Sequence, residues 1–306
     1  METLYRVRAK SVKACFISHF ERWYDMSIII SNDYKQMIVN DYSSHVQTIE
    51  SLCHKYNLSC PTIIKILKEY NIPTYTKQQL YSIGLKEDIF NVIDTEEKAY
   101  FLGFLLADGC VFYDKNRLNS SPKILFGLKS EDSYMVELFH KFINAQTSLR
   151  IDNRDGKGTV SCVVSSFKMA EDLSFYGIAN PKFLRPLPIV RYDLVHHLIR
   201  GFFDGDGCFT FGLAHPERKI CNSYSGRVAL ITYEILKEDV IRILECIGIS
   251  HWRTERCNSQ TYLEMVDIRR KNEIALFYNF IYQDGTIYLT RKKEKFEQYF
   301  RLNHMI

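Results

Sequence analysis

The stretch FLGFLLADG occupies residues 101–109, and the stretch IRGFFDGDG occupies residues 199–207. Each has a glycine in its third position, an apolar middle, and an aspartate between a small residue and a final glycine. A glycine inside a helix costs about 1 kcal/mol relative to alanine, so its repetition at Gly103 and Gly201 indicates a packing role. We predict that two helices pack side by side at these glycines, because a residue without a side chain lets another backbone come close.

The aspartates Asp108 and Asp206 then stand at the C-terminal tips of the two helices. A carboxylate is disfavoured at this end, where the helix dipole is negative, and two packed helices bring both carboxylates together. Like charges in proximity need a counter-ion, and oxygen ligands suit Mg²⁺. One such Asp-Gly pair alone is more typical of a turn, but its duplication favours a metal site. We also predict that Gly109 and Gly207 end the helices in the left-handed conformation.

The order of predicted elements repeats around the two stretches: helix, two strands, helix, two strands, helix. In the first copy, a helix that starts at residues 94–97 is followed by strands at 109–113 and 123–128, a helix at 130–144, strands at 147–151 and 159–165, and a helix at 167–176. The second copy has a helix at 193–204, strands at 208–213 and 227–233, a helix at 236–247, strands at 251–257 and 261–268, and helices at 271–282 and 291–301. A duplication of roughly 100 residues is too long for a solenoid repeat. It predicts an α+β fold of two αββαββα half-domains related by a pseudo-twofold axis, with a small N-terminal helical domain.

That separate helical region precedes the duplication. Between residues 41 and 76, apolar residues at helical spacing are interrupted at residues 57–59 and resume after Pro61. Two short helices joined by a tight turn are typical of a helix-turn-helix, although an ordinary helical hairpin has the same pattern. We divide the chain into an N-terminal helical region at 1–76, a linker at 77–93, and half-domains at 94–185 and 186–306.

Composition sets few limits on function. The 306 residues carry a net charge of +4, which permits nucleic-acid binding but does not argue for it. No apolar run approaches the ~20 residues needed to span a bilayer, and no apolar segment follows the basic residues of the N-terminus. The nine cysteines include no CxxC pair, so we expect no structural zinc site, and their odd number fits a reducing compartment. The protein is expected in the cytoplasm, a nucleus or an organelle, and neither secreted nor bound to a membrane.

The pattern resembles the LAGLIDADG homing endonuclease family in its single-chain, two-motif form. The resemblance covers Glu96 to Arg301 and rests on HLIRGFFDGDGCFTF at 197–211, YGIANPKFLRPLP at 176–188 and YLTRKKEKF at 288–296. The first motif departs from the second at Leu106, where the second has Asp204. The N-terminal region resembles the helix-turn-helix modules attached to mobile-element nucleases and recombinases.

The resemblance implies metal-dependent cleavage of double-stranded DNA at a long, specific site. Asp108 and Asp206 would hold divalent metal, expected to be Mg²⁺, assisted by the carbonyls of Ala107 and Gly205. The cations expected near the phosphates are Lys182 and Lys292, with Lys293 and Lys129 as alternatives. The strands would form two saddle-shaped sheets in the major groove, and the side chains expected at DNA are Tyr113, Lys115, Arg117, Lys123, Arg150, Arg154, Arg218, Lys219, Arg227, Arg253 and Arg256.

A monomer is expected, because one chain carries both motifs. Its activity would promote the mobility of its own intron or intergenic element. Two alternatives stay open on the same scaffold: an RNA maturase, which would add intron RNA as a partner, and a DNA-binding regulator that does not cleave.

Overall fold

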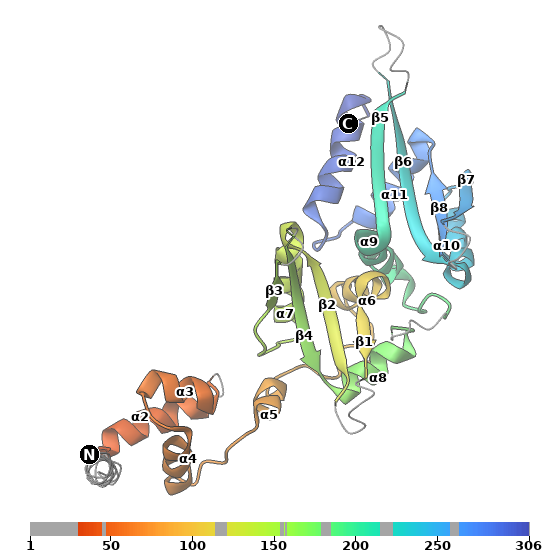
Figure 1. The fold of residues 1–306 in the computed structure, drawn as a ribbon. Helices are drawn as coiled ribbons and strands as arrows, with labels where there is room; N and C mark the ends of the chain where they lie inside the picture. Colours follow the sequence, from red (N-terminus) through yellow and green to blue (C-terminus); the bar gives the residue numbers. More distant parts are fainter. Residues whose placement is uncertain are drawn as a thin grey trace, which may run out of the picture. The chain divides into compact units, whose positions relative to one another are not determined.

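The computed structural model describes residues 30–44, 47–113, 121–153, 156, 158–178, 185–214, 223–257 and 263–305. The chain divides into two compact units, Met1–Leu80 and Tyr81–Ile306 (Figure 1). Among the described residues, the helices are too short or too polar to cross a membrane.

The first unit contains three helices in its described part: α2 (Asn32–Ser43), α3 (Ile49–Tyr56) and α4 (Cys60–Glu69). Ser31, Thr48 and Ser59 precede them, and each side-chain oxygen accepts a hydrogen bond from a first-turn backbone N–H. Asn57 ends α3 in the left-handed conformation, at φ 50°. The helices share one small core that includes Ile38, Leu52 and Ile63. A further short helix, α5 (Lys77–Ser82), crosses the boundary between the units.

The first half of the second unit carries a four-stranded antiparallel sheet in the order β1-β2-β4-β3. Its elements, in chain order, are α6 (Glu96–Asp108), β1 (Cys110–Phe112), β2 (Lys123–Lys129), η1 (Ser130–Asp132), α7 (Ser133–Phe142), β3 (Arg150–Asp152), β4 (Thr159–Ser165) and α8 (Phe167–Phe175).

The second half repeats this arrangement, with the strand order β5-β6-β8-β7. Its elements are η2 (Tyr192–Leu194), α9 (Val195–Asp206), β5 (Gly207–Leu213), β6 (Tyr224–Tyr233), α10 (Glu234–Cys246), β7 (Trp252–Arg256), β8 (Leu263–Ile268), α11 (Lys271–Tyr282) and α12 (Thr290–Leu302). The two halves have the same order of elements, so the predicted α+β fold with a duplicated αββαββα unit is confirmed.

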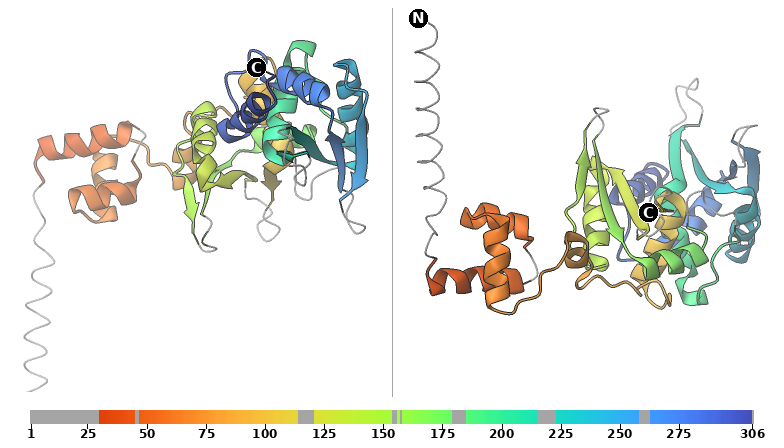
Figure 2. Two further views of the ribbon diagram at one scale, coloured as in Figure 1. Left: turned by 90° about the horizontal axis from the view of Figure 1, so that it is seen from above. Right: turned by 60° about the horizontal axis from the view of Figure 1, so that its bottom comes forward.

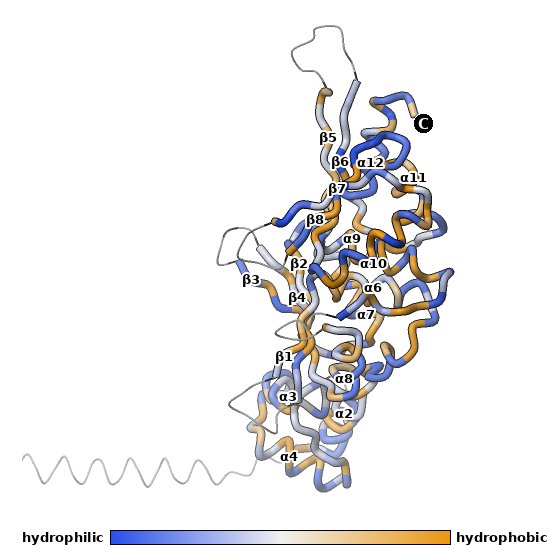
Figure 3. The backbone as a smooth tube through the Cα atoms, turned by 90° about the vertical axis from the view of Figure 1, so that its right-hand side faces the viewer, coloured by the Kyte–Doolittle hydropathy of each residue, from blue (hydrophilic) through white to orange (hydrophobic). Residues whose placement is uncertain are grey.

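Helices cover one face of each sheet. In the first half α7 packs on β2 and β4, and in the second half α10, α11 and α12 pack on β5, β6 and β8. The strands of both sheets lie along one side of this unit and most of its helices along the other (Figure 3). The central pair α6 and α9 joins the two halves (Figures 1 and 2). One face of each sheet is therefore left without a helical cover in the described structure.

Two local expectations differ from the structure. Leu85, Ile89, Phe90 and Ile93 are buried in the core of the second unit, so the second part of the predicted linker 77–93 is packed chain. Their apolar side chains gain more by joining the core than the segment gains by staying free.

The predicted left-handed helix ends were wrong. Gly109 (φ −76°, ψ 156°) and Gly207 (φ −84°, ψ 153°) are extended, because each helix runs directly into a strand. Space requires glycine here: a Cβ would lie 2.5 Å from the Leu105 carbonyl oxygen at position 109 and 2.5 Å from the Phe203 carbonyl oxygen at position 207.

Candidate active site

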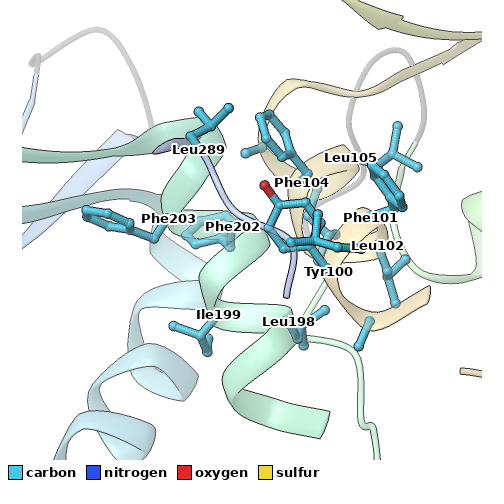
Figure 4. Close-up of a cluster of buried hydrophobic side chains, with 14 of the residues drawn as sticks. Tyr100, Phe101, Leu102, Phe104, Leu105, Leu198, Ile199, Phe202, Phe203 and Leu289 are labelled. Carbon is cyan, nitrogen blue, oxygen red and sulfur yellow. The ribbon is translucent and has the colours of Figure 1, made fainter. Parts of the chain in front are cut away.

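Two glycines let α6 and α9 approach until their backbones touch. A Cβ on Gly103 would lie 2.0 Å from the carbonyl oxygen of Leu198, and a Cβ on Gly201 would lie 1.9 Å from the carbonyl oxygen of Tyr100. The contact is reciprocal: Gly103 faces Leu198, one turn before Gly201, and Gly201 faces Tyr100, one turn before Gly103. Buried side chains such as Phe101, Phe104 and Phe202 surround this crossing (Figure 4). The positions predicted for the helix contact, Gly103 and Gly201, thus lie at the crossing.

The C-terminal ends of the two helices also meet. A Cβ on Gly205 would lie 2.3 Å from the Cβ of Ala107 and 3.4 Å from Oδ2 of Asp108. The carboxylate of Asp108 is therefore beside the residue that directly precedes Asp206. Asp108 is exposed and Asp206 half-buried, so both lie where the helix pair reaches the surface.

Asp108 borders a cavity of about 560 Å³. The cavity is lined by residues of both halves: Asp108, Leu125, Gly127, Leu128, Lys129, Asp132, Thr159, Ser161, Asp204, Gly205, Leu289 and Arg291. Arg291 holds Asp132 with Nε and Nη2 at 3.0 and 2.7 Å, which ties the start of α12 to the first half. Lys129, at the end of β2, adds an exposed cation to the same cavity. The cavity thus combines carboxylates with cations from both halves.

Lys292, in the first turn of α12, binds the C-terminal end of α9. Its Nζ donates hydrogen bonds to the carbonyl oxygens of Phe203, Asp204 and Gly207 at 2.7, 2.7 and 2.6 Å. The Phe203 carbonyl also accepts the N–H of Gly207, and the Asp204 carbonyl belongs to the last turn, where helix carbonyls lack intrahelical partners. The cation offsets the negative end of the helix dipole. Burial lowers the pKa of Lys292 to about 8, against the effect of the Asp204 and Asp108 carboxylates. A contact between this ammonium and a phosphate would require it to leave the helix end.

The other predicted lysines differ in their surroundings. The ammonium of Lys293 lies 4.2 Å from the centre of the Tyr288 ring. Lys182 lies outside the described residues. Among the predicted cations that the structure describes, Lys129 is the one that lines the cavity beside Asp108.

Asp204 is a buried connector. Its Oδ2 accepts hydrogen bonds from the Tyr100 hydroxyl and the Leu289 backbone N–H, both at 2.8 Å. Its Oδ1 has no hydrogen-bond partner among the described residues. Burial raises the pKa of Asp204 to about 6, while Lys292 and the two donors favour the ionised form. Asp204 therefore links α6, α9 and the start of α12, and the corresponding Leu106 in α6 is simply buried.

A second cross-helix contact was not predicted from the sequence. The guanidinium of the fully buried Arg200 bonds Glu96 Oε1 at 2.6 Å and the carbonyl oxygens of Ile281 and Ile287 at 2.8 and 2.7 Å. Glu96 also accepts hydrogen bonds from the backbone N–H and the hydroxyl of Thr286. The one available signal was an arginine within the apolar run HLIRGFF, a position that a charged side chain occupies only with partners.

The donors at the helix ends fit a hard divalent cation. Asp108 and Asp206 supply carboxylate oxygens and the preceding residues, Ala107 and Gly205, supply backbone carbonyls, which is the ligand chemistry of Mg²⁺. Asp108 is exposed, so water can complete the coordination shell. The residues at the two helix ends thus fit the divalent metal that the resemblance implied.

Side chains predicted to contact DNA divide by sheet face. In the first sheet, Lys123 and Arg150 share the face opposite the buried Ile124 and Phe126. In the second, Arg227 pairs with Thr210, and Arg253 lies opposite Asp267 on the same face. This is the face without helices, and it is called the open face below.

Arg256 lies on the other face of its strand. It pairs with Glu264, whose carboxylate bonds Lys237 of α10, so this register position belongs to the helix-covered face. Tyr113, just beyond β1, is exposed. The remaining predicted DNA contacts lie outside the described residues: Lys115, Arg117, Arg154, Arg218 and Lys219.

No protein-family model and no curated protein matches the chain. Among solved structures, the meganuclease I-AabMI bound to uncleaved DNA is similar at a TM-score of 0.49 and 12% identity, over 67% of this chain and 90% of that one. I-GzeII in complex with its DNA target has a TM-score of 0.49 and 13% identity, over 68% and 90% of the two chains. I-LtrWI bound to target DNA has a TM-score of 0.47 and 14% identity, over 72% and 91%. All three are LAGLIDADG enzymes, the family that the two motifs of this chain predicted.

Proposed function

We propose that this chain is a LAGLIDADG homing endonuclease that uses a divalent metal to cleave double-stranded DNA at a specific site. One observation carries the proposal: the closely packed helices α6 and α9 end with Asp108 Oδ2 3.4 Å from the Cβ position of Gly205, the residue before Asp206. Asp108 borders a cavity that also contains Lys129 and Arg291. A carboxylate at the joined helix ends, one residue from Asp206, is costly unless a cation and an anionic substrate bind there.

The protein's own residues divide the work. Asp108 and Asp206, with the carbonyls of Ala107 and Gly205, would hold the metal. When bound, such a metal would supply an activated water and stabilisation of the leaving oxygen in an in-line displacement. Lys129 places a positive charge where negative charge develops on the phosphate of the first half.

Lys292 acts as a positioning residue in this scheme. Its three bonds to carbonyls hold the end of α9, and Asp206 is the last residue of that helix. The ammonium therefore fixes the backbone from which the second carboxylate projects. Asp204 in turn fixes Lys292 electrostatically and anchors α9 to α6 through Tyr100.

The open face is the proposed DNA surface. Strands fit the major groove and carry side chains that reach base edges. Lys123, Arg150, Arg227 and Arg253 supply positive charge on that face in both halves. One side chain is held in place: Arg227 bonds Asp267 at 3.0 Å, so its position is set before DNA arrives.

The first unit supplies a second grip on DNA in this proposal. Helices α3 and α4, joined at residues 57–59, have the size and spacing of a helix-turn-helix, and Lys65 and Lys68 are exposed on α4. Replacing both lysines with alanine should weaken DNA binding and lower its dependence on salt, because each phosphate contact contributes about one unit of salt slope. Unchanged affinity in anisotropy titrations would remove the first unit from the DNA-binding role.

The cleavage test starts by selecting duplexes that bind the full chain from a randomised pool in Ca²⁺. Selected duplexes are then incubated with Mg²⁺, and both strands are analysed for cuts. Asp108→Asn and Asp206→Asn should bind the duplexes as the wild type does and lose cutting on at least one strand. Asp88→Asn, an exposed acid outside the site, is the matched control. Binding without any cut by the wild type would favour a regulator, and full cutting by both variants would refute the proposed site.

A cut at a specific site invites repair that copies in the element encoding the enzyme, so the proposed biological role is mobility of an intron or intergenic element. The protein would act as a single chain in whichever compartment holds that DNA, because both catalytic carboxylates belong to one polypeptide.

A further inference from the structure

A second cluster of metal-ligating side chains lies at the opposite end of α9 from Asp206. It consists of His196 and His197, in the first turn of α9, and Asp284, which follows α11. One ligand atom from each of the three residues lies within 4.8 Å of the others. His196 Nε2 and Asp284 Oδ1 are 2.9 Å apart, and the two imidazole rings have their centres 3.8 Å apart.

The fold builds this cluster. Both histidines are buried, at 5% and 6% exposure. Asp284 has a φ of 44°, and this left-handed conformation turns the chain back towards the start of α9. The carboxylate of Asp284 is largely exposed, so it can move towards a ligand without disturbing the core.

One nitrogen in the cluster has no partner. His197 Nδ1 is buried and has no hydrogen bond among the described residues, and its nearest carboxylate oxygen, Glu96 Oε1, is 3.9 Å away. That oxygen is already bonded to Arg200 and to the backbone of Thr286. A buried polar group without a partner costs about 1–3 kcal/mol, and such groups are rare in folded proteins.

We propose that His196, His197 and Asp284 form a binding site for a divalent transition metal of the Zn²⁺ class. Two imidazoles and one carboxylate are a ligand set that Zn²⁺ takes, with water in the fourth position. Ligand atoms on one tetrahedral Zn²⁺ lie about 3.3 Å apart, and those here lie within 4.8 Å of one another, so metal binding would bring a pair closer by at most about 1.5 Å. The positive end of the α9 dipole opposes a cation at this place, and the carboxylates of Asp284 and Glu96 offset it.

The metal would tie the turn between α11 and α12 to the start of α9. That turn leads to Leu289 and Lys292, which hold Asp204 and the far end of the same helix. The site is structural in this proposal and takes no part in cleavage. It stands independently of the proposed nuclease function. It differs from the expectation of no structural zinc site, which considered cysteine ligands, because these ligands are two histidines and an aspartate.

The test is equilibrium dialysis of the purified full chain against Zn²⁺, in excess Mg²⁺ so that oxygen-only sites are filled. The wild type should bind one Zn²⁺ per chain, and Co²⁺ in its place should give the strong visible absorption of a tetrahedral site with nitrogen ligands. Asp284→Asn, at an exposed position, should weaken Zn²⁺ binding at least tenfold, and His197→Gln should weaken it further. His54→Gln, an exposed histidine on α3, is the control and should bind as the wild type.

Two results would overturn the site: no stoichiometric Zn²⁺ on the wild type, or unchanged Zn²⁺ affinity in both Asp284→Asn and His197→Gln. Mg²⁺-dependent cleavage should be retained by Asp284→Asn, so failure of this site and failure of the nuclease assignment are distinguishable.

Discussion

Replacing Gly103 or Gly201 with alanine should destabilise the second unit strongly, because the new methyl group has no room. A Cβ at these positions would lie 2.0 and 1.9 Å from backbone carbonyl oxygens of the facing helix. Backbone atoms cannot rotate out of the way as a side chain can. The only relief is a separation of α6 and α9.

The size of that separation sets the cost. Non-bonded heavy atoms have their optimum near 3.5 Å, so the helices must part by more than 1 Å, and a gap of 0.5–1 Å already loses about a quarter to a half of the dispersion energy between surfaces. Overpacking a core costs about 1–3 kcal/mol and occasionally more. Alanine returns about 1 kcal/mol of helix propensity. Because the new methyl group meets backbone atoms, the upper end of the overpacking range applies, and we expect a net loss of about 2 kcal/mol or more in the free energy of unfolding for either variant.

The double variant should cost less than the sum of the two single variants. Both methyl groups act at the same crossing, so the separation forced by the first relieves the second. We expect a coupling of at least about 0.5 kcal/mol in this direction.

Urea unfolding followed by tryptophan fluorescence measures these changes. The chain has two tryptophans, and with Trp23→Phe the remaining Trp252, in β7, reports on the second unit alone. Gly212→Ala is the matched control, since a Cβ there meets nothing within 4 Å, and it should stay within about 0.5 kcal/mol of the parent. If Gly103→Ala and Gly201→Ala are as mild as Gly212→Ala, the backbone contact between the helices is not what the structure indicates.

Three further outcomes follow from the site. Burial raises the pKa of Asp204 from 3.8 to about 6, so the folded state holds this proton more tightly than the unfolded state. About 3 kcal/mol of stability that is present below pH 4 is therefore lost as pH rises through 6. Asp204→Asn should remove this pH dependence from urea midpoints measured between pH 4 and 7. Lys292→Met leaves three helix-end carbonyls and Asp204 without their cation and should cost about 3 kcal/mol or more at pH 7 by the same assay, whereas a loss below 1 kcal/mol would contradict its role at the helix end. Arg253→Ala on the open face should weaken DNA binding in anisotropy titrations and Arg256→Ala on the helix-covered face should not; equal effects would remove the open face as the DNA surface.

The sequence predicted the duplicated scaffold because its signal is local and repeated. Gly103 and Gly201 sit five residues before Asp108 and Asp206, and this spacing alone indicates which helices meet and which ends carry the acids. The periodicity of the strands and helices around them then predicted two equivalent sheets. Local patterns of this kind survive in a single sequence without any knowledge of the fold.

Contacts between distant residues could not be predicted in the same way. Glu96 and Arg200 are 104 positions apart, and Asp132 and Arg291 are 159 apart. An arginine in an apolar helix shows that a partner exists, but many acids in the chain could be that partner. The prediction of left-handed ends at Gly109 and Gly207 was wrong for a related reason. Glycine is required there because a side chain would collide with Leu105 or Phe203 in the preceding turn, and that collision depends on the folded backbone.

The duplicated scaffold has diverged at its centre, and strand register shows where. Cys110 pairs with Leu125 in the first sheet and Cys208 pairs with Ala229 in the second, each cysteine directly following the motif glycine. Lys129 lies four residues after Leu125 on β2, and Tyr233 lies four residues after Ala229 on β6.

Equivalent positions beside the two carboxylates therefore carry a cation in one half and a phenol in the other. Burial and the nearby Asp206 raise the pKa of Tyr233, so this group is a neutral hydrogen-bond donor at pH 7. A cation stabilises a developing phosphate charge better than a neutral donor does. On the proposed mechanism, the DNA strand that is cut at Asp206 should therefore be cleaved more slowly than the one cut at Asp108. Nicked plasmid should accumulate before linear product with the wild type, and Lys129→Met should reduce that accumulation by slowing the faster cut; simultaneous appearance of both cuts in the wild type would show that the asymmetry has no catalytic effect.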